Sequence, residues 1–152
     1  LFSDPGVDWA RIAKIRSWTK LPIVLKGIMR GDDAAKAVSE GYDGIMVSNH
    51  GGRQVDGGIG ALDALPGVVA ATAGKIPVFM DSGIRCGADI FKALALGATA
   101  VGIGRPYVYG LSLAGEQGVQ TVMEYLLAEL DITMALNGCQ TPKDITPGNL
   151  HR

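Results

Sequence analysis

Hydrophobic residues gather in four short runs, at residues 22–26, 44–48, 77–81 and 99–104. Continuous apolar runs of this length are typical of strands that are buried on both faces of a parallel sheet. Each run ends in a polar residue or a glycine, and each is followed by a glycine-rich or charged segment. The pattern therefore predicts four parallel strands that carry functional loops at their carboxyl ends.

Helical patterns separate the runs, and they cover residues 32–40, 61–73 and 87–96. Gly41 and Gly97 follow two of these segments directly, where the first residue after a helix is commonly a glycine. Pro66 and Gly67 interrupt the middle segment and weaken its helical signal. Upstream, Asp4-Pro5 is a candidate cap for a helix that runs to about residue 18.

The same unit occurs twice. Ser48 stands seven residues after Gly41, and Gly104 stands seven residues after Gly97. Both stretches are interpreted as helix end, glycine, turn, strand and then loop. Repeated βα units predict a parallel α/β architecture, either a barrel or an open sheet.

Polar residues at the strand ends favour the barrel. The strand ends are Lys26, Ser48, Asp81 and Gly104, and His50, Arg53, Arg85 and Arg105 lie just beyond them. In a TIM (β/α)₈ barrel these ends form one mouth, which holds the active site. An open sheet would place its ligand groups at a single switch point.

Four strands make half of such a barrel, and a whole barrel takes about 250 residues. We expect residues 1–152 to be the C-terminal half of a single barrel domain whose N-terminal half is absent from this chain. A stretch with helical spacing from residue 119 to 134 is expected to close the barrel, and residues 141–152 to form a loop and tail.

Charge and composition exclude several classes of function. The formal net charge of −1 provides no basic surface for nucleic acid. No apolar run approaches the roughly 18 residues that a membrane span needs, and no signal peptide is recognisable. Cys86 and Cys139 have no metal-ligand spacing, so we expect reduced thiols, no bound metal and a cytoplasmic location.

The loop after the second run, residues 47–54, carries both a histidine and an arginine. Histidine exchanges a proton near neutral pH, and arginine can bind a carboxylate through two parallel hydrogen bonds. His50 and Arg53 therefore predict a site that binds and deprotonates an organic acid. The alternatives are a loop histidine held by backbone groups and a surface ion pair between Arg53 and Asp56.

Two further loops pair glycine with arginine, at residues 81–85 and 104–106. Loops in these positions of a barrel commonly bind phosphate through backbone N–H groups and a helix N-terminus. Lys26 ends a buried strand, so its ammonium group needs a partner. That partner is either Asp81, in a purely structural ion pair, or a ligand that develops negative charge. Cys86 is expected to be inert.

The segments LPIVLKGI, GIMVSNHGGRQ, PVFMDSGIRCGADIFKALALGA and VGIGRPYVYG together resemble the FMN-dependent L-2-hydroxy acid oxidase and dehydrogenase family. The resemblance extends from about residue 9 to 138. Residues 107–110 and 61–66 are more similar to the lactate-oxidising branch than to plant glycolate oxidases.

The resemblance implies a role for each candidate residue. His50 would be the base and Arg53 the carboxylate ligand. The FMN-binding residues would be Lys26 at the flavin N1/C2 edge, Ser48 against the flavin, Asp81 at the ribityl hydroxyls, and Ser82, Gly83, Arg85, Gly104 and Arg105 around the phosphate. Ser82 replaces a glycine that is common in the family, a change that we expect to be tolerated.

The implied reaction is oxidation of a small L-2-hydroxy acid, foremost L-lactate, to the 2-oxo acid, with reoxidation by O2 or another acceptor. Lactate 2-monooxygenase and glycolate or mandelate oxidases or dehydrogenases are alternatives within the family. The family also implies a homotetramer, and an aspartate from the N-terminal half that orients the histidine, so this half alone should be inactive. Outside the family, the alternatives are another phosphate-binding barrel enzyme, with Lys26 as an amine nucleophile, and a half-barrel without catalytic function.

Overall fold

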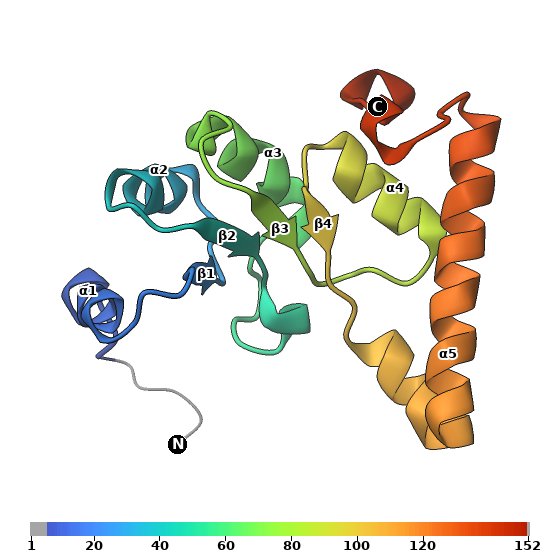
Figure 1. The fold of residues 1–152 in the computed structure, drawn as a ribbon, viewed down its shortest axis with the longest axis horizontal. Helices are drawn as coiled ribbons and strands as arrows, with labels where there is room; N and C mark the ends of the chain where they lie inside the picture. The colour runs from blue at the N-terminus through green and yellow to red at the C-terminus, as the bar shows by residue number, and fades with distance from the viewer. Residues whose placement is uncertain (1–5, 152) are drawn as a thin grey trace.

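Four strands form one parallel sheet in the computed structural model, which describes residues 6–151 (Figure 1). The strands lie in the order of the chain, β1 (Val24–Lys26), β2 (Gly44–Val47), β3 (Val78–Met80) and β4 (Ala100–Val101). Leu25 pairs with Ile45, Ile45 with Val78, and Met80 with Val101. The predicted strands are thus all present, in a single sheet.

Helices connect successive strands, as parallel pairing requires. The connecting helices are α2 (Gly31–Ser39), α3 (Ala61–Thr72) and α4 (Gly87–Ala95), while α1 (Trp9–Trp18) precedes β1 and α5 (Arg105–Leu136) follows β4. Short 3₁₀ turns cover His50–Gly52, Pro142–Asp144 and Pro147–Asn149. Figure 1 shows α2, α3 and α4 along one side of the sheet, so these crossover helices cover one face.

The covered face contains most of the core. Ile45, Val47, Leu65 and Val68 are fully buried between the sheet and the helices. The opposite face carries Lys26, which is in register with Met46 and through it with Phe79. The prediction that both faces are buried is therefore wrong for the described residues, because no second layer covers the face that bears Lys26.

Several predicted boundaries need correction. The strand β1 ends at Lys26 as the apolar run indicated, whereas β2, β3 and β4 end earlier than their runs, so that Ser48 and Asp81 already belong to loops. The helix α3 continues through Pro66 and Gly67, which were expected to interrupt it. The first helix begins at Trp9 after Asp8, whose carboxylate accepts the N–H of Arg11 at 2.8 Å. The proposed Asp4-Pro5 cap lies outside the described residues.

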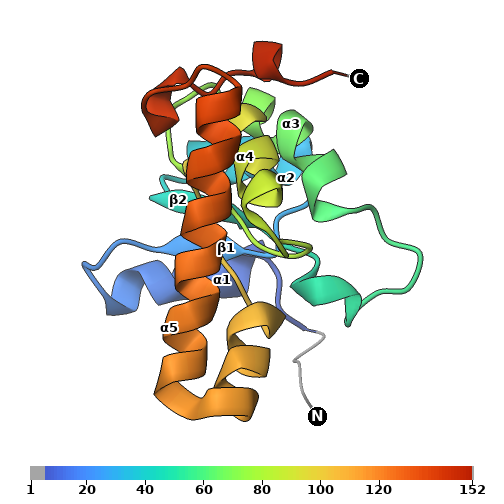
Figure 2. The same ribbon diagram turned by 90° about the vertical axis from the view of Figure 1, so that its right-hand side faces the viewer.

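The last helix is longer than predicted and consists of two arms. It begins at Arg105, and its backbone departs from helical geometry at Ala114 and Gly115. Its arms approach so closely that a Cβ on Gly110 or Gly118 would overlap the other glycine's backbone. The second arm packs against α4 at the edge of the sheet (Figure 2). Within residues 6–151, no helix combines the length and apolar character needed to cross a membrane.

Candidate active site

A cavity of about 420 Å³ opens at the carboxyl ends of the strands. Nine of the ten residues that the sequence singled out line it, namely Lys26, His50, Arg53, Asp81, Ser82, Gly83, Arg85, Gly104 and Arg105. These residues lie at or just beyond the carboxyl ends of all four strands, so the fold gathers side chains that lie up to 79 positions apart between Lys26 and Arg105. The cavity lies where a barrel has its mouth.

Ser48 is the exception, because it is buried and lines a neighbouring cavity instead. Its hydroxyl oxygen accepts a hydrogen bond from Lys26 Nζ at 2.7 Å and another from the backbone N–H of His50 at 3.1 Å. Ser48 therefore holds the Lys26 side chain and the His50 backbone in place, while its own contact with a ligand stays a prediction.

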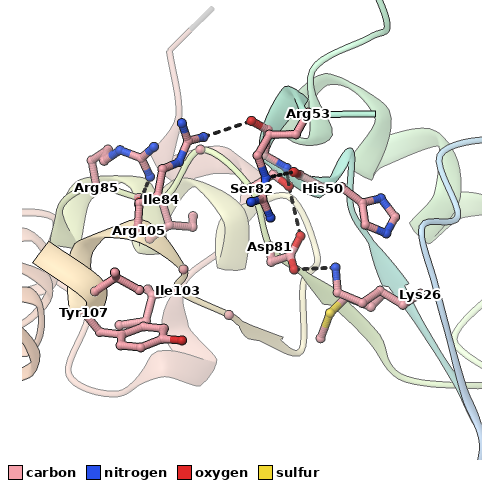
Figure 3. A pocket seen from close by; sticks show the side chains of 16 residues that line it. Lys26, His50, Arg53, Asp81, Ser82, Ile84, Arg85, Ile103, Arg105 and Tyr107 are labelled. Atoms are coloured by element: carbon pink, nitrogen blue, oxygen red, sulfur yellow. Dashed lines mark hydrogen bonds and ion pairs between the residues drawn. The ribbon is translucent and has the colours of Figure 1, made fainter. Parts of the chain in front are cut away.

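Lys26 and Asp81 form an ion pair with 2.7 Å between Nζ and Oδ2 (Figure 3). Asp81 is thus the partner expected for Lys26 if the lysine only forms a structural ion pair. The pair remains accessible from the cavity, since 45% of the Lys26 side chain is exposed. The ammonium group can therefore serve Asp81 and a ligand at the same time.

The pKa of the Asp81 carboxyl lies below its ordinary value. Burial alone would raise this pKa, but hydrogen bonds from Lys26, Ser48 and Ser82 and the charge of Lys26 outweigh that effect. Asp81 is therefore a stable anion at neutral pH and an acceptor of hydrogen bonds.

His50 and Arg53 occupy the short turn after β2. The ring of His50 lies beside Gly27, where an added Cβ would stand 3.0 Å from His50 Cε1. Arg53 Nε donates to the carbonyl of His50 at 3.2 Å, which leaves its terminal amino groups available. Within residues 6–151 no ion pair joins Arg53 to Asp56, so that alternative is not observed.

A second cavity of about 430 Å³ borders the other side of the histidine. Gly27, Asn49 and Ile59 are among its lining residues, and His50 lines both cavities. The imidazole consequently stands between the two spaces. No hydrogen bond or ion pair engages the imidazole within the described part of the chain.

Two arginines occupy the other end of the first cavity (Figure 3). Arg85 Nη1 donates to the carbonyl of Ile84 at 2.8 Å, and Arg105 Nη2 donates to the carbonyl of Gly51 at 2.9 Å. Arg105 is the first residue of α5, and Gly104 before it gives no side-chain cap. The free N–H groups of this helix start thus add to the positive potential of the arginines.

The helix α4 cannot contribute in the same way. The carboxylate of Glu129 accepts the N–H of Gly87 at 2.8 Å, and Asp89 accepts those of Arg85 and Cys86 at 2.9 and 3.3 Å. Of the two loops that the sequence paired, only the one before α5 therefore leaves a helix N-terminus open. Sequence reasoning missed Glu129 because it lies 42 residues from Gly87.

Comparison with known proteins gives concordant matches. The family model described as FMN-dependent dehydrogenase matches residues 1–152. The chain is 55% identical over 142 residues to 2-hydroxyacid oxidase 1 of Mus musculus, covering 93% of this chain and 38% of that protein. It is 53% identical over 148 residues to an L-lactate oxidase of Nostoc, covering 97% of this chain and 40% of that protein.

Among solved structures, mandelate oxidase with (S)-4-hydroxymandelic acid superposes with a TM-score of 0.87 at 45% identity, covering 90% of this chain and 39% of that chain. This likeness confirms the predicted fold class, an α/β part of a TIM barrel. The chain spans about two fifths of the length of the curated relatives it matches, 38% and 40% in the two cases above.

Proposed function

Because the chain belongs to the FMN-dependent dehydrogenase family, we propose that it carries the FMN site and the base of an enzyme that oxidises a small L-2-hydroxy acid. L-Lactate is the first candidate substrate, and the product is the 2-oxo acid. The observation that carries the proposal is the convergence of an imidazole, three arginines and an ion-paired lysine on one cavity.

The residues of the cavity fit FMN. Arg85, Arg105 and the open start of α5 can hold the phosphate through charge-assisted hydrogen bonds. Asp81 would offer carboxylate oxygens to the ribityl hydroxyls, and Lys26 would supply positive charge to the flavin N1/C2 edge. The volume of about 420 Å³ lies within the range of small-molecule sites. Bound FMN would accept the two electrons that leave the substrate and later pass them to O2.

Arg53 would anchor the substrate. Its Nε is engaged by the His50 carbonyl at 3.2 Å, so the two terminal amino groups remain for the carboxylate. This bond also fixes the carboxylate anchor next to the base. His50 would then take a proton from the substrate as the C2–H bond breaks.

Other barrel chemistries fit less well. A Lys26 that acts as an amine nucleophile would need a free lone pair, whereas its Nζ donates to both Asp81 and Ser48 at 2.7 Å. A half-barrel without catalytic function would not explain why charged groups converge on the cavity. We therefore retain the oxidation of 2-hydroxy acids.

We infer further that residues 1–152 are the C-terminal half of one barrel domain. The four-stranded sheet, its uncovered face and the 38–40% coverage of relatives support this. An N-terminal half would supply the remaining strands and a carboxylate that orients His50. Residues 1–152 alone would therefore be inactive. Homotetramer formation, a cytoplasmic location and O2 as acceptor stay predictions, testable by light scattering, cell fractionation and peroxide assay.

The test is an anaerobic titration of the complete FMN-loaded polypeptide with L-lactate, glycolate and (S)-mandelate. We expect the visible flavin absorbance to bleach with at least one acid, fastest with L-lactate. His50→Gln should slow reduction by about 10²- to 10⁴-fold, the usual contribution of a positioned base. Bleaching by none of these acids would refute the proposal. Peroxide formation after air is admitted distinguishes an oxidase from a 2-monooxygenase.

A further inference from the structure

The turn that carries His50 has an uncommon backbone. His50, Gly51 and Gly52 have φ angles of 56°, 70° and 74°, so three successive residues are left-handed. For a residue other than glycine this conformation costs on the order of 1–3 kcal/mol, and it persists only where the surroundings impose it. The contacts that impose it determine where the imidazole lies.

Three of these contacts are local. The hydroxyl of Ser48 accepts the N–H of His50 at 3.1 Å, and the amide oxygen of Asn49 accepts that of Gly52 at 3.0 Å. Arg53 Nε donates to the His50 carbonyl at 3.2 Å. Each bond spans three residues or fewer, so these bonds shape the turn locally, and Ser48 also ties it to Lys26 of β1.

Two contacts come from distant loops, and both engage Gly51. The hydroxyl of Ser82 accepts the Gly51 N–H at 3.1 Å across 31 residues. Arg105 Nη2 donates to the Gly51 carbonyl at 2.9 Å across 54 residues. The turn is thus bonded to the loop after β3 and to the first residue of α5 (Figure 3).

Ser82 is an unusual residue for this position. Its φ of 77° suits a glycine, which would adopt it without strain. The serine hydroxyl has a single proton, which it donates to Asp81 Oδ1 at 3.0 Å, while its oxygen accepts from Gly51. The hydroxyl is therefore used twice within the protein, and it links the histidine turn to the Lys26–Asp81 pair.

We propose that Ser82 is a positioning residue, which sets the place of His50 through the Gly51 peptide instead of binding the cofactor phosphate. The proposal rests on the proposed function, in which His50 is the base. Its structural part, the hydrogen bond from Gly51 to Ser82, can be measured independently of any activity.

The test compares Ser82→Ala with Ser82→Gly in the complete FMN-loaded polypeptide. Both variants lose the hydroxyl, but only Ser82→Gly also relieves the left-handed strain. We expect both to exchange the Gly51 amide hydrogen about tenfold faster and to slow anaerobic flavin reduction about five- to tenfold, since in each the Gly51 N–H loses its hydrogen bond to the Ser82 hydroxyl. FMN affinity should stay within about twofold. Ser112→Ala, which removes an exposed hydroxyl bonded to the Tyr109 carbonyl, is the control.

Three results would overturn the inference. One is unchanged exchange at Gly51. Another is FMN affinity that falls about tenfold while the reduction rate holds, which would make Ser82 a cofactor ligand. The third is a wild-type reduction rate in Ser82→Gly, which would show that His50 is placed correctly without the Ser82 hydroxyl. If His50→Gln reduces flavin at the wild-type rate, the proposed function fails, whereas the exchange result still stands.

Discussion

Gly27→Ala should separate the placement of His50 from the stability of the fold. Gly27 has a φ of 94°, so alanine there is strained by about 1–3 kcal/mol. The new Cβ would lie 3.0 Å from His50 Cε1, against an ordinary contact of at least 3.4 Å. The ring or the β1 loop must therefore move by about 0.4 Å. A misplacement of 1 Å can cost about 10²-fold in rate, so we expect flavin reduction to slow by about tenfold.

Gly41→Ala is the matched control. Gly41 has a φ of 77°, and an added Cβ there meets no atom within 4 Å. The Gly41→Ala variant should lose about as much unfolding free energy in urea as Gly27→Ala, but it should keep the wild-type rate of flavin reduction by L-lactate. Equal reduction rates in the two variants would refute the contact argument, because strain alone would then explain both.

Two further predictions concern charge. Asp81→Asn should lower stability at pH 7 by about 1 kcal/mol or less, since the ion pair it breaks is partly exposed. The folded-state pKa of Asp81 is depressed, so its stabilisation is present above the unfolded value of about 3.9 and is lost as pH falls through the folded pKa. Urea unfolding at pH 7, 4 and 3 should show the two proteins converging, and a constant gap would contradict this. Arg105→Met should weaken FMN binding about 10- to 100-fold by fluorescence titration, the worth of a charge-assisted hydrogen bond. Arg30→Met, at an exposed residue paired with Asp32, should bind FMN normally, and equal loss in both would exclude a specific phosphate contact.

The βα alternation was predictable because each apolar run and each helix-terminating glycine is a local signal. Gly41 and Gly97 do adopt the left-handed conformation expected after a helix. The extent of α5 was not predictable, because Gly115 does mark a break in its helical backbone whereas Gly110, which suggests another, lies within the first arm. Gly110 is instead tolerated because the second arm of the helix folds back against it.

At the candidate site, the residue types were predictable and their contacts were not. Selecting polar residues and glycines around the carboxyl ends of the predicted strands identified ten residues, and nine of them line one cavity. This is because parallel strands present their carboxyl ends at one edge. The selection could not show that Arg105 binds the Gly51 carbonyl or that Glu129 occupies the start of α4, since those contacts join residues 54 and 42 positions apart. It also missed the buried position of Ser48, because a strand-end serine has the same sequence signal whether it faces a ligand or supports a neighbour.

The contacts of His50 divide its placement into two independent parts. Its backbone is bonded by Ser48 and Arg53 and is held through the neighbouring Gly51 peptide by Ser82, all within this chain. Its imidazole has no carboxylate partner among residues 6–151, although a base that becomes cationic is stabilised by one. A fixed backbone sets where the ring attaches, but it leaves the rotation of the ring and the choice of tautomer open. Both would be decided by a group facing the second cavity, which is where we expect the N-terminal half of the barrel to complete the site.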